Sequence, residues 1–136
     1  MKTTRGIRNN NPCNIRRSRV IWQGEVSQLN GVHDKAFCQF ESMKMGLRAA
    51  FVLMRSYRNI HRLYDIDGVI KRWAPPEDGN DTEAYIKFVA TQTGIDRDDY
   101  LMYTDLMKVV EAMCKMESNY TPKDDELTKA FYMVFG

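Results

Sequence analysis

A single glutamate lies at the end of an amphipathic stretch, in a position that suits acid–base chemistry. Residues 106–118 read as a helix with one apolar stripe, counted at about 100° per residue. The stripe consists of Leu106, Val110 and Met113, and Glu117 falls on it as well. Charged residues occupy the opposite face, at Lys108, Glu111 and Lys115. We therefore expect the Glu117 carboxyl to point toward the packed side of the helix.

Such a position would favour the protonated form of the carboxyl. Desolvation opposes the charged form, and the negative end of the helix dipole adds to that effect. A carboxyl that keeps its proton near neutral pH is what a general acid needs. The alternative is that the helix frays before Glu117 and the side chain simply reaches water.

Apolar residues at helical spacing predict five helices that would position this carboxyl. They begin near residues 43, 65, 82, 105 and 122. Their expected N-terminal caps are Ser42, Asp81 or Asn80, Thr104 and Thr121. The second helix should end at Pro75-Pro76, and the third at Gly94.

Between about Ile15 and Phe40 the sequence predicts a small β-hairpin or β-meander. The segment from Ile15 to Trp22 looks extended, and Phe37 to Phe40 reads as a short strand. Asn30-Gly31 between them is a strong turn signal. Together with the helices, this predicts an α+β, mostly helical fold that forms one domain over residues 1–136.

Composition narrows the class of protein. The 136 residues are 43% hydrophobic and 28% charged, which fits a globular domain and excludes a largely disordered chain. The net charge of +2 is too small to argue for nucleic-acid binding. Basic residues do crowd the N-terminus, at Arg5, Arg8, Arg16, Arg17 and Arg19. They form either a solvated basic face or a surface that attracts a polyanion such as a bacterial wall.

Cysteine use and hydropathy bear on cofactors and location. Cys13, Cys38 and Cys114 are odd in number and lack zinc-type spacing, so we expect free thiols, no metal and no cofactor. The first residues have no apolar segment of the signal-peptide kind, and no run is long enough to cross a membrane. We expect synthesis in the cytoplasm, with delivery by other means if the protein acts elsewhere.

Several motifs together resemble one family of small proteins. They are RGIRNNNP at 5–12, WQG at 22–24, RWAPP at 72–76 and NDTEAY at 80–85. This combination is similar to phage and prophage proteins that are labelled virion structural or endolysin-like, and the similarity covers nearly the whole chain. It implies a bacterial host, with action at the cell wall or within a virion.

A more distant likeness implies chemistry. The order of four features resembles wall glucosaminidases of the lysozyme-like superfamily. These features are an asparagine-rich turn, Trp22-x-Gly24, a Phe-x-x-Phe-x-Ser motif that ends at Ser42, and then a helix. In those enzymes the catalytic glutamate precedes the turn. Here the apolar run that ends in Glu117-Ser118 resembles the glutamate helix of lytic transglycosylases, but it lies at the other end of the chain. The resemblance therefore implies a circularly permuted lysozyme-like domain.

The function implied is cleavage of peptidoglycan by a muramidase, glucosaminidase or lytic transglycosylase. Glu117 would be the general acid, and Glu41 is the leading second carboxylate, ahead of Glu25 and Asp34. Without a second carboxylate, the substrate's own N-acetyl or hydroxyl group would have to assist. Candidate substrate-binding residues are Asn11, Asn14, Trp22, Trp73, Tyr85 and Ser118. The tryptophans and the tyrosine are equally compatible with core positions.

Two other functions compete with this one. The first is a non-catalytic virion or wall-binding protein that keeps the fold, with other virion proteins as partners. The second is a small DNA-binding protein that uses the N-terminal arginines. For catalysis, residues 9–14 and the end of the Glu117 helix must meet at one cleft, and we predict that they do.

Overall fold

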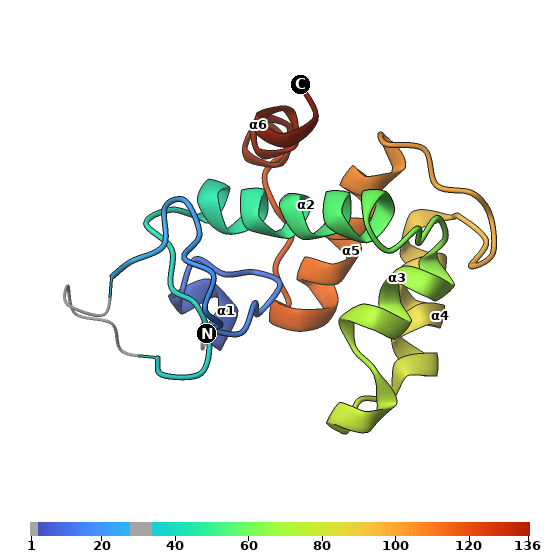
Figure 1. Ribbon diagram of the computed structural model, residues 1–136, viewed down its shortest axis with the longest axis horizontal. Helices are drawn as coiled ribbons and strands as arrows, with labels where there is room; N and C mark the ends of the chain where they lie inside the picture. Colours follow the sequence, from blue (N-terminus) through green and yellow to red (C-terminus); the bar gives the residue numbers. More distant parts are fainter. Residues whose placement is uncertain (1–2, 28–33) are drawn as a thin grey trace.

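The computed structural model describes residues 3–27 and 34–136 (Figure 1). Its helices are α1 (Arg5–Arg8), α2 (Met43–Asn59), α3 (Ile66–Trp73), α4 (Thr82–Thr93), α5 (Asp105–Ser118) and α6 (Asp124–Phe135), with a short 3₁₀ turn, η2 (Pro76–Asp78), after α3. The five longer helices appear in the order predicted from apolar spacing.

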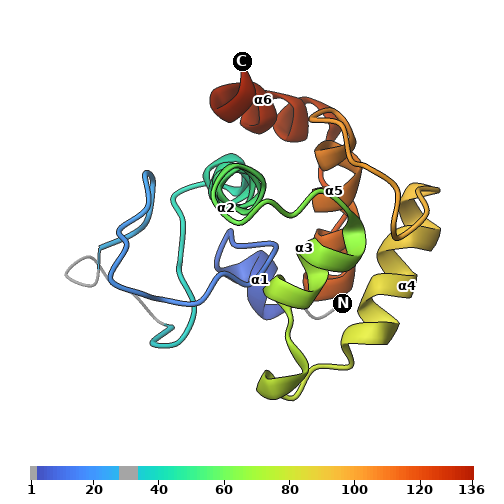
Figure 2. The ribbon, with the colours of Figure 1, turned by 45° about the vertical axis from the view of Figure 1, so that its right-hand side comes forward.

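The helix that carries Glu117 lies at the centre of the packing. α5 contacts α1, α2, α4 and α6, and Figure 2 shows it between α2 and α4. Its predicted stripe of Leu106, Val110 and Met113 is buried. Burial of each such side chain contributes about 1.5–3 kcal/mol. The end of α5 is therefore anchored to the core by the turns that precede it.

The remaining helices close the core on either side of α5. α6 packs across α2, where Phe51 meets Phe131 and Phe135 edge-on at centroid distances of 5.5 and 6.3 Å. α3 packs against α4, which in turn covers α5. These contacts fix Trp73, at the end of α3, close to the end of α5.

Two of the predicted N-terminal caps, Ser42 and Asp81, are confirmed. Ser42 accepts from the backbone N–H of Met45, and Asp81 accepts from that of Ala84. Gly94 ends α4 in the left-handed conformation, with φ of 71°. These signals are local, since a cap bonds only to the next three residues of its own helix.

One further predicted start is right in position only, and another is wrong. α5 begins directly after Thr104, as predicted, but the Thr104 side chain makes no capping hydrogen bond. The Asp105 carboxylate accepts from the backbone N–H of Met102. α6 begins at Asp124 rather than directly after Thr121. There the Glu126 carboxylate reaches back to the backbone N–H of Lys123 at 3.0 Å and satisfies the helix start from within.

The predicted β-hairpin is absent from the described residues, and the α+β lysozyme-like fold is therefore wrong. Only two isolated bridges occur, Arg16 with Phe37 and Glu25 with Phe40. The Asn30-Gly31 turn lies outside the described residues. The protein is helical, and the circular permutation inferred from the lysozyme-like order loses its basis.

Backbone and side-chain hydrogen bonds together join the two extended segments. The N–H of Arg17 donates to the Ala36 carbonyl and the N–H of Cys38 donates to the Ile15 carbonyl, both at 2.9 Å. The Asn11 amide accepts from the N–H of Ile15 and donates to the carbonyls of Ile15 and Cys38. The Asp34 carboxylate accepts from the N–H groups of Ala36 and Phe37. Because side chains satisfy other backbone groups next to these bonds, the pairing around Arg16 and Phe37 does not extend into a regular ladder.

None of the helices in the described part of the chain has the length and apolarity needed to cross a bilayer. Within residues 3–27 and 34–136, no cluster of three or more His, Cys, Asp or Glu side chains is placed to hold a metal ion.

Candidate functional site

The N-terminal turn packs directly on the C-terminal end of α5, as predicted. The Thr4 hydroxyl donates to the Ser118 carbonyl at 2.6 Å, and the Ser118 hydroxyl donates to the Pro12 carbonyl at 2.8 Å. A Cβ at Gly6 would lie 1.8 Å from the Ser118 Oγ, so this approach requires glycine. Residues separated by more than a hundred positions thus form one local structure.

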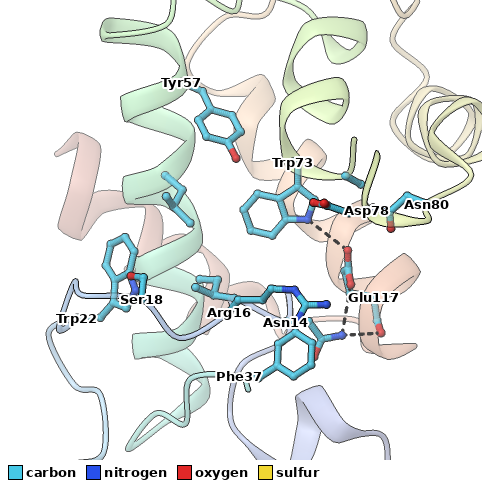
Figure 3. A pocket seen from close by; sticks show the side chains of 13 residues that line it. Asn14, Arg16, Ser18, Trp22, Phe37, Tyr57, Trp73, Asp78, Asn80 and Glu117 are labelled. Carbon is cyan, nitrogen blue, oxygen red and sulfur yellow. Dashed lines mark hydrogen bonds between the residues drawn. The ribbon is translucent and has the colours of Figure 1, made fainter. Parts of the chain in front are cut away.

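Asparagine is suited to the conformation of this turn. Asn10 and Asn14 have φ of 51° and 54°, in the left-handed region that asparagine tolerates better than most residues. The side chain of Asn14 then faces α5 (Figure 3). Its Nδ2 donates to the backbone carbonyl of Glu117 at 3.1 Å and to Oε1 of the Glu117 carboxylate at 3.3 Å.

The Glu117 carboxylate is held by donors from three separate segments. Besides Asn14, the indole Nε1 of Trp73 donates to Oε2 at 3.2 Å, and the Tyr85 hydroxyl donates to Oε2 at 2.9 Å. Trp73 comes from α3 and Tyr85 from α4. The carboxylate is partly buried and has a fixed orientation, since each oxygen has its own donors.

A pocket of about 360 Å³ opens beside this carboxylate. Aromatic, amide and charged side chains line it: Asn14, Arg16, Ser18, Trp22, Phe37, Tyr57, Trp73, Asp78, Asn80 and Glu117, with Ile15, Leu53 and Ala74. In Figure 3 Trp22 lies at one end, Glu117, Asp78 and Asn80 lie at the other, and Arg16 lies between them. This mixture of flat apolar faces and hydrogen-bonding groups suits a polar ligand with ring-shaped parts.

Two tyrosines near the pocket keep their protons. Burial, followed by the negative charge of Glu117, raises the pKa of Tyr85 well above its ordinary value. Burial also raises the pKa of Tyr57, and nearby Arg72 partly opposes this. Tyr85 therefore remains a hydrogen-bond donor to Glu117 throughout the physiological pH range.

Comparison with known proteins gives one clear relative. No family model matches the chain. Protein P5 of Pseudoalteromonas phage PM2 is 40% identical over 138 residues, which cover 98% of this chain and 84% of Protein P5. The chain belongs to the Protein P5 family. It is thus a phage-related protein, as its motifs predicted, and the match gives no support to the lysozyme-like part of the resemblance.

This member of the Protein P5 family brings several predicted residues together. Asn14, Trp22, Trp73 and Glu117 line the same pocket. Tyr85 does not line it, because its side chain is buried beneath the site with 5% exposure, but it bonds to Glu117. Tyr85 is therefore placed to orient the carboxylate.

Three other predicted site residues lie outside the pocket lining. Asn11 is fully buried, and its amide is occupied by the backbone of residues 15 and 38. Ser118 is buried and tied to the carbonyl of Pro12. Glu41, which lies just before α2, is exposed and is not a lining residue. The first two maintain the turn and do not face a ligand.

The second-choice carboxylates also have other partners. Asp34 accepts two hydrogen bonds from the Arg5 guanidinium, at 2.6 and 2.8 Å, and Arg5 holds the pKa of Asp34 well below its ordinary value. Glu25 pairs with Arg17 at 3.2 Å. Two of the crowded N-terminal arginines are therefore neutralised by carboxylates of the chain itself.

Sequence reasoning missed Arg16, Asp78 and Asn80 as pocket residues. Arg16 carried a usable signal, because it belongs to the N-terminal arginines that the sequence singled out as a possible surface for a polyanion. Asp78 and Asn80 follow the Pro75-Pro76 break, and only the turn of η2 brings them back over the end of α3. No periodic pattern in that loop could have predicted this.

Proposed function

We propose that this chain is a peptidoglycan-cleaving glycosidase of a phage, in which Glu117 is the general acid. The observation that carries the proposal is the Glu117 carboxylate, held by Asn14, Trp73 and Tyr85 on the wall of a ligand-sized pocket. Glycoside cleavage usually requires a positioned carboxyl that protonates the leaving oxygen. Three donors from three segments give Glu117 the positional precision that this step demands.

The pocket also offers a second carboxylate for this reaction. Asp78 takes the place of Glu41 as the candidate, because Asp78 lines the pocket and Glu41 does not. In most glycosidases the second carboxylate either activates water or attacks the sugar. Asp78 stands at the same end of the pocket as Glu117 (Figure 3), so both would face the same part of a bound glycan.

The lining favours a glycan as substrate. Trp22, Phe37, Tyr57 and Trp73 supply flat apolar surfaces for sugar rings, and Asn14 and Asn80 supply amides for hydroxyl groups. Two buried polar atoms in this lining, Asn14 Oδ1 and Trp22 Nε1, have no hydrogen-bond partner among the described residues. Buried polar groups are seldom left unpaired, and sugar hydroxyls would supply the partners.

The proposed function also implies a binding partner and a place where the protein acts. A peptidoglycan strand is the substrate, and a phage protein would meet it during entry or lysis, either as part of a virion with other virion proteins or after delivery from the cytoplasm. No cofactor or metal enters the proposed reaction, since both carboxylates belong to the chain.

The test is incubation with purified peptidoglycan and mass analysis of the released fragments. Glu117→Gln should lower cleavage by at least about 100-fold, because the shape is kept and the transferable proton is lost. Glu111→Gln, on another face of α5, is the matched control and should cleave like the parent. A reducing end on the fragments would indicate hydrolysis, and an anhydro end would indicate a lytic transglycosylase. Equal cleavage by Glu117→Gln and the parent would reject the proposal.

One observation favours a non-catalytic phage protein instead. The hydrogen bonds of Glu117 join α3, α4, α5 and the N-terminal turn, so the residue could serve only to hold these segments together. In that case the parent would release no fragments, and Glu117→Gln would mainly lower the free energy of unfolding. Measuring unfolding and cleavage on the same variant separates the two functions.

A further inference from the structure

Arg16 is the positively charged side chain in the lining of the pocket, among the described residues. Its guanidinium carbon lies 4.8 Å from the centroid of the Phe37 ring. In Figure 3 this guanidinium lies over Phe37 and next to Asn14, inside the pocket. Contact with an aromatic ring restrains the planar group and leaves its N–H edges free to donate.

Two arginines near Arg16 form ion pairs with carboxylates, whereas Arg16 does not. Arg5, which also contacts the Phe37 ring, forms an ion pair with Asp34, and Arg17 forms one with Glu25. In the described part of the chain, no carboxylate lies within ion-pair distance of the Arg16 guanidinium. An unpaired guanidinium inside a pocket is suited to bind an anionic group of a ligand.

The two carboxylates of the pocket would also fix the orientation of an anionic ligand. Glu117 and Asp78 stand together at one end, away from Trp22. Their charges would repel an acidic group of the ligand from that end, whereas Arg16 would attract it. An acidic glycan would therefore be bound in one orientation, with its anionic substituent at Arg16.

We propose that Arg16 forms an anion subsite for the free lactyl carboxylate of N-acetylmuramic acid units that carry no peptide, so that the pocket prefers these units over peptide-linked units and uncharged amino sugars. This inference rests on the proposed glycosidase function of the same pocket and names the feature of the substrate that it recognises. A guanidinium and a carboxylate form two parallel hydrogen bonds, which gives geometric selectivity as well as attraction.

The test compares N-acetylmuramic acid with its carboxamide, which has the same shape without the charge. Neither contains a bond between two sugars, so cleavage cannot complicate the binding. The protein has two tryptophans, and both line the pocket, so their indole N–H signals in NMR titrations report directly on the site. We expect the acid to bind the parent about five- to tenfold more tightly than the carboxamide.

Arg16→Gln should remove this difference and leave the weaker binding of the carboxamide unchanged. Arg16→Lys should keep part of the difference, because the charge remains but the planar fork is lost. Arg19→Gln is the matched control, since Arg19 is also exposed but lies outside the pocket lining. Equal binding of acid and carboxamide, or an equal loss in Arg19→Gln, would overturn the subsite. Failure of the acid to shift either indole signal would also overturn it.

Failure of this inference can be distinguished from failure of the glycosidase. A charge preference that depends on Arg16, with no cleavage of peptidoglycan by the parent, would keep the subsite and reject the catalytic role of Glu117. If cleavage depends on Glu117 but Arg16→Gln has no effect on binding of the acid, the glycosidase is kept and the anion subsite is rejected.

Discussion

Asn14 and Glu117 are 103 positions apart in the chain, yet one amide group of Asn14 contacts both the backbone carbonyl and the carboxylate of Glu117. The contact at 3.1 Å satisfies a carbonyl in the last turn of α5, and the contact at 3.3 Å orients the acid. Helix ends leave carbonyls without partners, so this asparagine supports the helix and the site at once.

Asn14 can be tested with two substitutions that separate its backbone role from its amide. Asn14→Gly keeps the left-handed backbone available and removes the amide, so we expect cleavage about tenfold lower with a small loss of stability. Asn14→Ala removes the amide and also strains the backbone, which should lower the free energy of unfolding by a further ~1 kcal/mol. Peptidoglycan cleavage and denaturant unfolding measure the two effects. Equal stability of the two variants would contradict this division.

Substitution of each tryptophan by phenylalanine tests the hydrogen bond from Trp73 to Glu117, with Trp22 as the control. Trp73→Phe removes the N–H that donates to Oε2, so we expect a loss of about 1 kcal/mol in stability and lower cleavage. Trp22→Phe removes a buried N–H that has no partner among the described residues, so the loss of that group should cost little stability. Chemical denaturation of both variants checks the order. A larger loss in Trp22→Phe would show that ring packing outweighs the hydrogen bond.

The three cysteines should be unreactive thiols in the folded protein. All three are free and buried, and the Sγ atoms of Cys13 and Cys114 lie 3.6 Å apart, too far for a disulfide bond. The hydrogen bond with Cys114, together with burial, raises the pKa of Cys13, and burial raises the pKa of Cys38 to about 11. Cys13 and Cys38 therefore form few thiolates near neutral pH, and burial limits access of a reagent to all three side chains.

A disulfide-forming thiol reagent at pH 8 should label the native protein slowly and all three cysteines after unfolding. The control is the number of thiols in unfolded protein after full reduction, which should equal the number in unfolded, unreduced protein. A count of one thiol in unfolded, unreduced protein would show instead that two of the cysteines are bridged.

Asp34 should make stability fall in acid. Arg5 is the main cause that lowers its pKa in the folded state, and hydrogen bonds from Phe37, Asn9 and Ala36 add to this. A lowered carboxyl pKa stabilises the fold above the ordinary pKa of 3.8, and this contribution is lost as the pH falls below that value. Asp34→Asn should therefore be less stable than the parent at pH 7, and the gap should narrow below about pH 4.

Urea unfolding from pH 7 to pH 2 measures this gap. Asp98→Asn is a suitable control, because Asp98 is exposed, and it should track the parent at every pH. A gap between Asp34→Asn and the parent that stays constant down to pH 2 would mean that the carboxylate charge contributes nothing.

Local pattern was sufficient for the helices and for the helix face of Glu117. The spacing of Leu106, Val110 and Met113 reflects burial on one side of a helix, and that periodicity is visible without knowing what covers it. The caps at Ser42 and Asp81 were equally predictable, because their partners lie three residues away. The start of α6 at Asp124, instead of directly after Thr121, was not predictable. There the Glu126 carboxylate bonds the backbone N–H of Lys123 and caps the helix in place of Thr121.

Long-range contacts decided the rest. Residues 15–40 have the extended segments and turn signal of a hairpin. Two backbone hydrogen bonds do join residues 15–17 to 36–38, but the Asn11 and Asp34 side chains bond the neighbouring backbone groups and the described residues form no ladder. Likewise, Glu117 was identifiable on its helix, whereas its donors Asn14, Trp73 and Tyr85 come together only when three other segments pack around α5. Side-chain hydrogen bonds between distant residues have no period in the sequence, so only the folded chain reveals them.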